Sequence, residues 1–194
     1  TGHNTGGMGA ISPVPFVTES FRKEIEKKII QPTIMGLKKD GMPYKGFVFI
    51  GLIKVGDEPK VIEYNVRLGD PETEVVLPRL KTDLLSLLIA VQQGRLAEVK
   101  LEIDPNVAAT VMAVSEGYPE SYEKGKQIIG LENTDMVFHA GTIAEGDNIL
   151  TNGGRVLAAT SFGKNFNEAV EKSFKTLEKI HFKGELNIGE SNSE

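Results

Sequence analysis

Residues 61–72, VIEYNVRLGDPE, alternate between apolar and polar side chains and then run into a Gly- and Pro-containing turn. Successive side chains of a β-strand point to opposite faces, so Glu63, Asn65 and Arg67 share one face. The residues between them are apolar and share the other face. The segment therefore predicts a strand with one apolar face and one polar face that is suited to binding charged groups.

The polar face of this strand carries oxygen donors at a spacing that suits a metal ion. Glu63 and Asn65 lie about 6.6 Å apart along a strand, so their oxygens can converge on one Mg²⁺ or bracket two ions. Magnesium binds few protein oxygens and keeps its other positions for water and phosphates. Arg67 could clamp a phosphate or carboxylate with its planar guanidinium. Spacing alone would favour the alternative, a solvated strand face with a weak surface ion pair.

The turn that follows the strand argues against a merely solvated face. Gly69 and Pro71 favour a rigid turn, and Asp70 and Glu72 add two carboxylates to the same region. Metal-assisted phosphoryl chemistry explains such a combination, because carboxylates hold the cations while Arg stabilises the transferring group. We therefore interpret residues 61–72 as the core of a candidate site.

A Gly-rich loop near the start of the chain, NTGGMG at residues 4–9, is the second candidate. Its unobstructed backbone N–H groups could cradle a phosphate or a carboxylate. The loop lacks the Gly-Lys-Ser/Thr ending of a P-loop, and no G-x-G-x-x-G follows a strand. Flexibility alone favours the alternative, an ordinary surface turn.

Charge and composition restrict the partners. The net charge of −5 and the pI near 5.4 disfavour a nucleic-acid partner, for which a basic surface is typical. The absence of Cys permits a reducing compartment, and no apolar run approaches the roughly 20 residues of a membrane span. We expect a cytoplasmic protein without membrane or nucleic-acid partners.

The first half of the chain predicts a helix, a hairpin and a second helix. The apolar period after Thr18 predicts a helix that Pro32 kinks or splits. Residues 46–55 and 60–68 predict a hairpin of buried strands. Residues 82–93 predict a short buried helix, capped by Thr82 or Asp83 and ended by Gly94.

Around residues 94–106 the sequence becomes charged and rich in turn residues, and the second half of the chain predicts a mostly antiparallel unit. Short strands are expected at 107–114, 136–143 and 155–162, with a hairpin turn at Asn152-Gly153-Gly154. One closing helix is expected at 165–180. We therefore expect an α+β chain with domains at residues 1–102 and 103–194, and a frayed tail at 189–194.

Four motifs together carry a resemblance to a known family. NTGGMGA, IEYNVRLGDPET, FHAGT at 138–142 and TNGGRVL at 151–157 stand in the same order as in phosphoribosylamine–glycine ligases, and the resemblance covers essentially the whole chain. It implies the C-terminal half of an ATP-grasp fold, followed by a small antiparallel β unit with one helix. Two departures are His3, where the family more often has Pro, and ELNIG at 185–189, which matches only partly.

The resemblance implies a C–N bond-forming ligase of purine synthesis. Its partners would be ATP, glycine and 5-phosphoribosylamine, which react through a glycyl phosphate to glycinamide ribonucleotide. The metal ligands would be Glu63 and Asn65, holding Mg²⁺ or Mn²⁺, and Arg67 would be the catalytic anion clamp. The substrate-binding residues would be Asn4, Thr5, Gly6, Gly7, Met8, Asp70, Pro71 and Glu72.

The resemblance also implies that the chain is a fragment. The family's N-terminal part, which grips the adenine of ATP, would precede Thr1, so we expect this chain alone to be inactive. Two alternatives stay open: another ATP-grasp carboxylate–amine ligase, or a noncatalytic metabolite-binding module. Arg155 follows a Gly-Gly turn, where Arg is usually solvated, and we expect it to lie outside the site.

Overall fold

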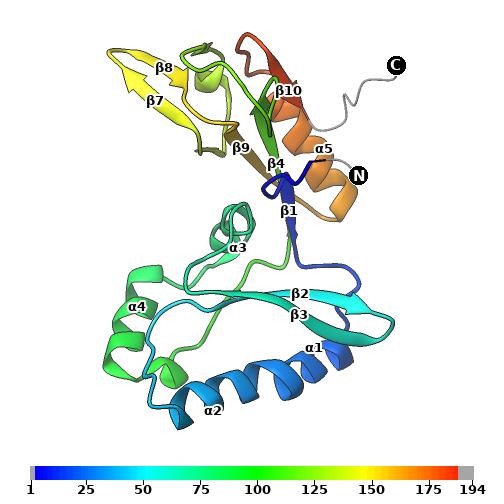
Figure 1. Ribbon diagram of the computed structural model, residues 1–194, viewed down its shortest axis with the longest axis vertical. Helices are drawn as coiled ribbons and strands as arrows, with labels where there is room; N and C mark the ends of the chain where they lie inside the picture. Colours follow the sequence, from blue (N-terminus) through cyan, green and yellow to red (C-terminus); the bar gives the residue numbers. More distant parts are fainter. Residues whose placement is uncertain (1–2, 188–194) are drawn as a thin grey trace. The chain divides into compact units, whose positions relative to one another are not determined.

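The computed structural model describes residues 3–187 of the chain. These residues form two compact units (Figure 1). The sheet unit comprises Thr1–Ser12, Asp70–Arg79 and Asp104–Glu194, and the ribbon unit comprises Pro13–Gly69 and Leu80–Ile103. The segments 1–12 and 70–79 therefore pack with the second half of the chain, although the sequence grouped them with the first. The domain boundary at residue 102 stays a prediction.

The sheet unit is built on an antiparallel sheet with strand order β1-β4-β9-β6, in which β10 also pairs with β4. The two central strands are long and rich in Ala and Val, and most of their residues are buried, as expected where both faces are covered. The strands are β1 Gly9–Ser12, β4 Val107–Ser115, β6 Val137–His139, β9 Arg155–Gly163 and β10 Glu185–Asn187. The predictions at 107–114 and 155–162 are confirmed.

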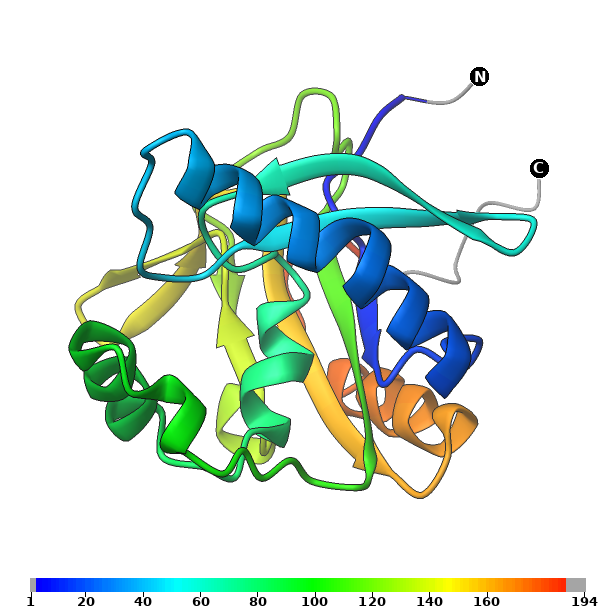
Figure 2. The same ribbon diagram turned by 90° about the horizontal axis from the view of Figure 1, so that it is seen from below.

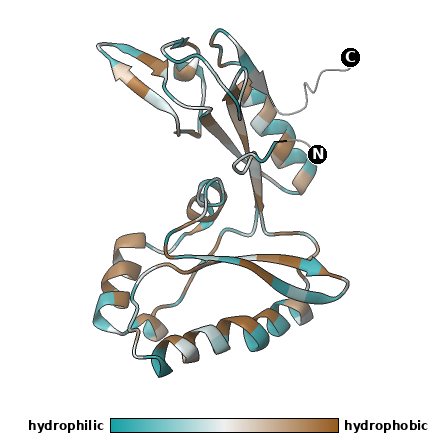
Figure 3. Cartoon of the chain, in the orientation of Figure 1, coloured by the Kyte–Doolittle hydropathy of each residue, from teal (hydrophilic) through white to brown (hydrophobic). Residues whose placement is uncertain are grey.

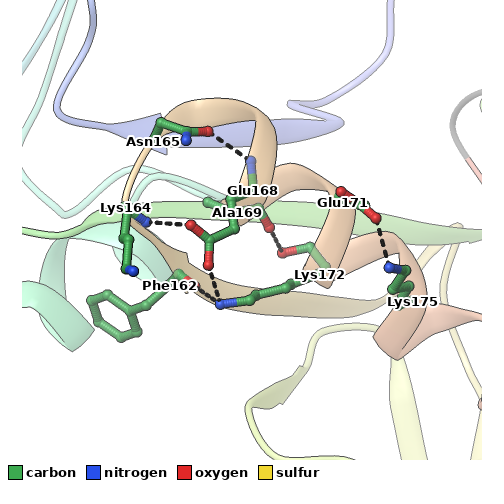
Figure 4. Close-up of polar contacts among 9 residues, drawn as sticks. Phe162, Lys164, Asn165, Glu168, Ala169, Glu171, Lys172 and Lys175 are labelled. Carbon is green, nitrogen blue, oxygen red and sulfur yellow. Dashed lines mark hydrogen bonds and ion pairs between the residues drawn. The ribbon is translucent and has the colours of Figure 1, made fainter.

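Helix α5, Phe166–Leu177, packs on β4 and β9 through Ala169, Ser173 and Leu177, all of which are buried. Two side-chain-to-backbone hydrogen bonds cap its N-terminus (Figure 4). Asn165 Oδ1 accepts from the backbone N–H of Glu168, and Glu168 Oε2 accepts from the backbone N–H of Lys164. The predicted closing helix is confirmed, and it ends earlier than residue 180.

A small three-stranded sheet in the same unit has the order β5-β8-β7. Its strands are β5 Gln127–Ile128, β7 Thr142–Glu145 and β8 Asn148–Thr151. The predicted hairpin at Asn152–Gly154 is wrong, because β8 pairs with β5 and β7 whereas β9 pairs with β4 and β6. The hairpin turn lies at Gly146-Asp147 instead, where Gly146 takes φ of 59°.

The close approach of Gly141 to Gly153 accounts for this arrangement. A Cβ on Gly141 would lie 2.6 Å from Gly153 Cα, and the N–H of Asn152 donates to the carbonyl of Gly141 at 2.7 Å, so the two backbones touch there. The single strand predicted at 136–143 is consequently two strands, β6 and β7, in different sheets. Helix α3, Thr73–Arg79, completes the unit against β1, β4 and β9.

The ribbon unit begins with a continuous helical segment made of α1 Glu19–Ile25, a π-helical turn Glu26–Ile30, and α2 Gln31–Lys39 (Figure 2). Thr18 caps it by accepting a hydrogen bond from the N–H of Phe21. Pro32 is the second residue of α2 and directly follows the π-helical turn, so the regular α-helix is interrupted next to the position that the sequence predicted.

Strands β2 Phe49–Val55 and β3 Glu58–Asn65 form a two-stranded ribbon, and α4 Leu84–Gln93 is capped by Asp83 and ends at Gly94. The expected burial is wrong for both: Ile62 and Leu85 are each 65% exposed. Figure 3 shows the apolar residues of α4 and of the ribbon in brown. Among the described residues, β2 and β3 pair only with each other, so no further strand covers their edges.

Candidate functional site

The Gly-rich loop and the Asp70-Pro71-Glu72 turn, which the sequence proposed as substrate-binding, lie against each other in the sheet unit. A Cβ on Gly7 would lie 2.4 Å from Cδ of Pro71 and 3.3 Å from the carbonyl oxygen of Asp70. Only glycine allows this approach. Pro71 is buried, and the carbonyl of Glu72 accepts from the N–H groups of Val75 and Val76 in α3.

The ends of the loop differ in their burial. Asn4 and Thr5 are exposed, whereas Met8 is half-buried against the core cluster of Met112 and Val114. The backbone N–H of Met112 donates to the carbonyl of Met8 at 3.0 Å, at the point where the loop enters β1. The loop is therefore anchored at its C-terminal end and open at the other.

Arg155, the first residue of β9, joins the loop to the turn. Its Nη1 donates to the carbonyl oxygens of Gly7 and Asp70, at 3.0 and 3.1 Å. Its Nη2 donates to Oδ2 of Asp70 at 3.0 Å. The Arg155 side chain is only 21% exposed, so the expectation that it is solvated is wrong. It contacts two of the candidate substrate-binding residues, Gly7 and Asp70.

Tyr118 supports the same loop from another side. Its hydroxyl accepts from the N–H of Gly6 at 2.9 Å, and its ring lies over Gly154, where a Cβ would come within 2.1 Å of Cδ2. Gly154 therefore makes room for the ring of Tyr118, whose hydroxyl holds the loop. Nothing in the sequence pattern marked Tyr118, whereas Arg155 stood inside the TNGGRVL motif and could have been found there.

Glu74, on the first turn of α3, is a further carboxylate of this region. Its Oε2 is buried and has no hydrogen-bond partner among the described residues. Burial raises the pKa of Glu74, the charges of Asp70 and Glu72 raise it further, and the charge of Arg155 opposes them. The turn thus concentrates negative charge around one guanidinium.

The metal and clamp residues expected from the sequence lie in the ribbon unit. Glu63 and Asn65 are on β3, with Glu63 exposed and Asn65 half-buried at the end of the strand. The partner of Glu63 across the ribbon is Gly51, which leaves its carboxylate room. The strand ends at Asn65, so Arg67 does not continue the polar face, and its Nη1 donates to the carbonyl of Leu68 at 2.9 Å.

The donor chemistry of Glu63 and Asn65 fits a magnesium ion. Within residues 3–187, the buried Nδ2 of Asn65 has no hydrogen-bond partner. Nδ2 is a donor, so any bond to a metal ion would come from Oδ1. One carboxylate and one amide oxygen are the hard donors that Mg²⁺ accepts in small number. In residues 3–187, no group of three or more His, Cys, Asp or Glu side chains could hold a metal ion.

The structure therefore brings together one set of candidate residues in each unit. The sheet unit unites Gly6, Gly7, Asp70 and Pro71 through Arg155, and the ribbon unit places Glu63 and Asn65 on one strand. None of the helices in the described part of the chain is long and apolar enough to cross a membrane.

Comparisons with known proteins agree with the order of these segments. Residues 1–73 match the family described as phosphoribosylglycinamide synthetase, ATP-grasp (A) domain, and residues 108–187 match the phosphoribosylglycinamide synthetase C domain. The phosphoribosylamine–glycine ligase of Chlorobaculum tepidum is 46% identical over 190 residues, which are 95% of this chain and 44% of that protein. The chain thus spans less than half the length of this relative.

Solved structures show the same fold. The phosphoribosylamine–glycine ligase of Thermotoga maritima superimposes with a TM-score of 0.83 at 36% identity, over 96% of this chain and 46% of that one. The biotin carboxylase domain of Hydrogenobacter thermophilus 2-oxoglutarate carboxylase, solved with magnesium ADP and bicarbonate, reaches 0.61 at 14% identity, over 93% and 40%. That second likeness shows the α+β ATP-grasp fold alone.

The two family segments follow each other in this chain in the order expected from its motifs, and both contain residues of the candidate site. The NTGGMG loop, Glu63, Asn65 and Asp70 lie in the first segment, and Arg155 lies in the second. The chain belongs to the phosphoribosylglycinamide synthetase family.

Proposed function

We propose that this chain is the metal-bearing part of a full-length phosphoribosylamine–glycine ligase. That enzyme would form glycinamide ribonucleotide from ATP, glycine and 5-phosphoribosylamine through a glycyl phosphate, in the cytoplasm. The observation that carries the proposal is the order of the two family segments in one chain, together with the relatives named for this ligase.

The candidate residues suit the chemistry of such a ligase. Activating a carboxylate with ATP needs a divalent cation that bridges phosphates and offsets their charge. Glu63 and Asn65 would hold that ion, Mg²⁺ or Mn²⁺, which would supply electrophilic assistance to phosphoryl transfer. Arg67, exposed beside them, would bind the anion that is transferred or formed.

The sheet unit would receive the amine substrate. 5-Phosphoribosylamine carries a phosphate, and the loop of Asn4–Met8 offers backbone N–H groups without bulky side chains at Gly6 and Gly7. Asp70, Pro71 and Glu72 would form the facing wall, since Pro71 already contacts the loop at Gly7. The position of Gly7 therefore links the loop and the turn in one substrate-binding region.

The full-length ligase tests this proposal directly. ADP and amide formation should require ATP, Mg²⁺, glycine and freshly generated phosphoribosylamine, each of which is omitted in turn. The isolated chain should show no turnover. Product without glycine, or with formate or bicarbonate in its place, would favour another ATP-grasp ligase, and no ATP turnover at all would favour a noncatalytic binding module.

The metal assignment has its own test in the full-length ligase. Asn65→Ala should raise the Mg²⁺ concentration needed for half-maximal ATP turnover by about tenfold, a loss of about 1.4 kcal/mol of binding. Asn148→Ala is the matched control, because Asn148 is the exposed first residue of β8 and its side chain bonds only Gln127 in the described structure. Normal metal dependence in Asn65→Ala would overturn the assignment.

A further inference from the structure

The backbone of Asn4–Gly7 is held by two side chains in the described part of the chain, Arg155 and Tyr118. Tyr118 contributes one hydrogen bond, to the N–H of Gly6. Arg155 contributes one to the carbonyl of Gly7 and two more to Asp70, so it also fixes where the loop stands relative to the turn. The guanidinium is planar and rigid, so its hydrogen bonds hold both segments in one geometry.

A loop with two consecutive glycines has many conformations when nothing holds it. A ligand that binds such a loop must order it, and that cost appears as weaker binding. The loop is also close-packed in its held form: a Cβ on Gly6 would lie 3.0 Å from Cζ and Nε of Arg155. The side chain that orders the loop thus contacts the very residues that carry its flexibility.

We propose that Arg155 is the positioning residue of the phosphoribosylamine-binding region, holding the Asn4–Met8 loop and the Asp70 turn in their binding arrangement before the substrate arrives. This inference rests on the proposed function and goes beyond it, because it assigns the affinity for one of three substrates to a residue of the C-domain segment. Arg155 acts through Gly7 and Asp70 and is given no contact with the reacting atoms.

Steady-state kinetics of the full-length ligase test the proposal. Arg155→Ala should raise KM for phosphoribosylamine about tenfold or more, while KM for ATP and glycine change less than about twofold. The turnover number should fall by less than about threefold, because ordering before binding affects the ground state and the transition state alike. Arg155→Lys should recover only part of the loss, since one ammonium cannot reproduce the three directed hydrogen bonds.

Chemical rescue separates positioning from a general structural role. Millimolar guanidinium should lower KM for phosphoribosylamine in Arg155→Ala and leave the wild type unchanged, whereas sodium chloride at equal ionic strength should not. Hydrogen exchange on the same variant should be faster in peptides covering residues 3–8 and 69–72, and unchanged in those covering α5. Arg22→Ala is the control, because Arg22 makes a two-pronged but fully surface pair with Glu19.

The outcomes distinguish the two proposals. An active wild type whose Arg155→Ala variant keeps its KM for phosphoribosylamine, or loses affinity for all three substrates together, would overturn the role of Arg155 alone. A wild type that forms no phosphoribosylamine-dependent product would overturn the proposed function, and the substrate named for this loop with it.

Discussion

Oδ2 of Asp70 lies 3.0 Å from Nη2 of Arg155, although the two residues are 85 positions apart in the chain. The ion pair is asymmetric in its environment, since the Arg155 side chain is 21% exposed and that of Asp70 is 50% exposed. Partial burial and a second hydrogen bond to the Asp70 carbonyl make this contact stronger than an ordinary surface pair.

Replacing Asp70 should therefore destabilise the chain measurably. Asp70→Ala is expected to lower the free energy of unfolding by about 1 to 2 kcal/mol, because it leaves a half-buried guanidinium short of a charged partner. Urea denaturation of the chain measures the effect. Glu171→Ala is the control, since its pair with Lys175 is fully surface-exposed and should contribute little to the free energy of unfolding (Figure 4). Equal decreases in the free energy of unfolding of the two variants would contradict the greater strength of the Asp70–Arg155 contact.

The close approach at Gly7 predicts that alanine is not tolerated there. Gly7→Ala would place a Cβ 2.4 Å from Cδ of Pro71, a buried and rigid ring, and should cost about 1 to 3 kcal/mol. Gly36→Ala is the opposite case, because nothing lies within 4 Å of its Cβ position in α2. That change should stabilise the chain by about 0.5 to 1 kcal/mol. Thermal melting of both variants measures the two changes in stability. A Gly7→Ala protein as stable as the wild type would show that the Asp70-Pro71-Glu72 turn shifts to accommodate the Cβ.

The N-cap of α5 should contribute to stability independently of the site. Asn165→Ala removes the side chain that accepts from Glu168 N–H and should lower the free energy of unfolding by about 1 kcal/mol. Asn165→Asp should retain most of the stability, because a carboxylate accepts the same hydrogen bond. Urea titrations of the three proteins give the comparison; similar stabilities for Asn165→Ala and Asn165→Asp would argue against capping.

The buried carboxyl group of Glu74 should make the stability of the folded chain depend on pH. Its pKa is raised above 4.5 in the folded chain, so the folded state binds the proton more tightly than the unfolded state does. Its stabilising contribution is complete below pH 4.5 and is lost as the pH rises through the folded-state pKa. Glu74→Gln should therefore melt at a higher temperature than the wild type at pH 7, and the difference should disappear at pH 4.

Thermal melting from pH 4 to pH 8 follows this effect. Glu171→Gln is a suitable comparison, because the hydrogen bond and charge of Lys175 lower the pKa of Glu171, the opposite direction to Glu74. A constant difference between Glu74→Gln and the wild type across this range would contradict the role of the buried carboxylate.

Features that depend on neighbours in the chain were predicted well. The caps at Thr18, Asp83 and Asn165 sit where the sequence placed the helix starts, and Gly94 ends α4. The spacing of Glu63 and Asn65 put both on one strand, as the structure has them. Capping, helical period and strand alternation arise from contacts within a few residues, so they can be read without knowing the fold.

Features that depend on distant partners were not predictable in this way. The Asn152–Gly154 turn has the composition of a hairpin, yet the strands around it find other partners, because Gly141 and Gly153 pack backbone against backbone. The expected burial of β2, β3 and α4 failed for a related reason, since apolar composition does not say which surfaces will meet.

Arg155 shows most clearly the difference between features set by neighbours in the chain and features set by distant partners. Its charge and its Gly-Gly context are visible in the sequence, but the side chain becomes part of the site only because β9 begins where the loop of residues 3–8 and the Asp70 turn converge. Local chemistry along the chain was sufficient to propose candidate residues for binding metal and phosphate. Which loops stand together, and which guanidinium holds them, follows from long-range packing, because three segments distant in sequence must first be folded against one sheet.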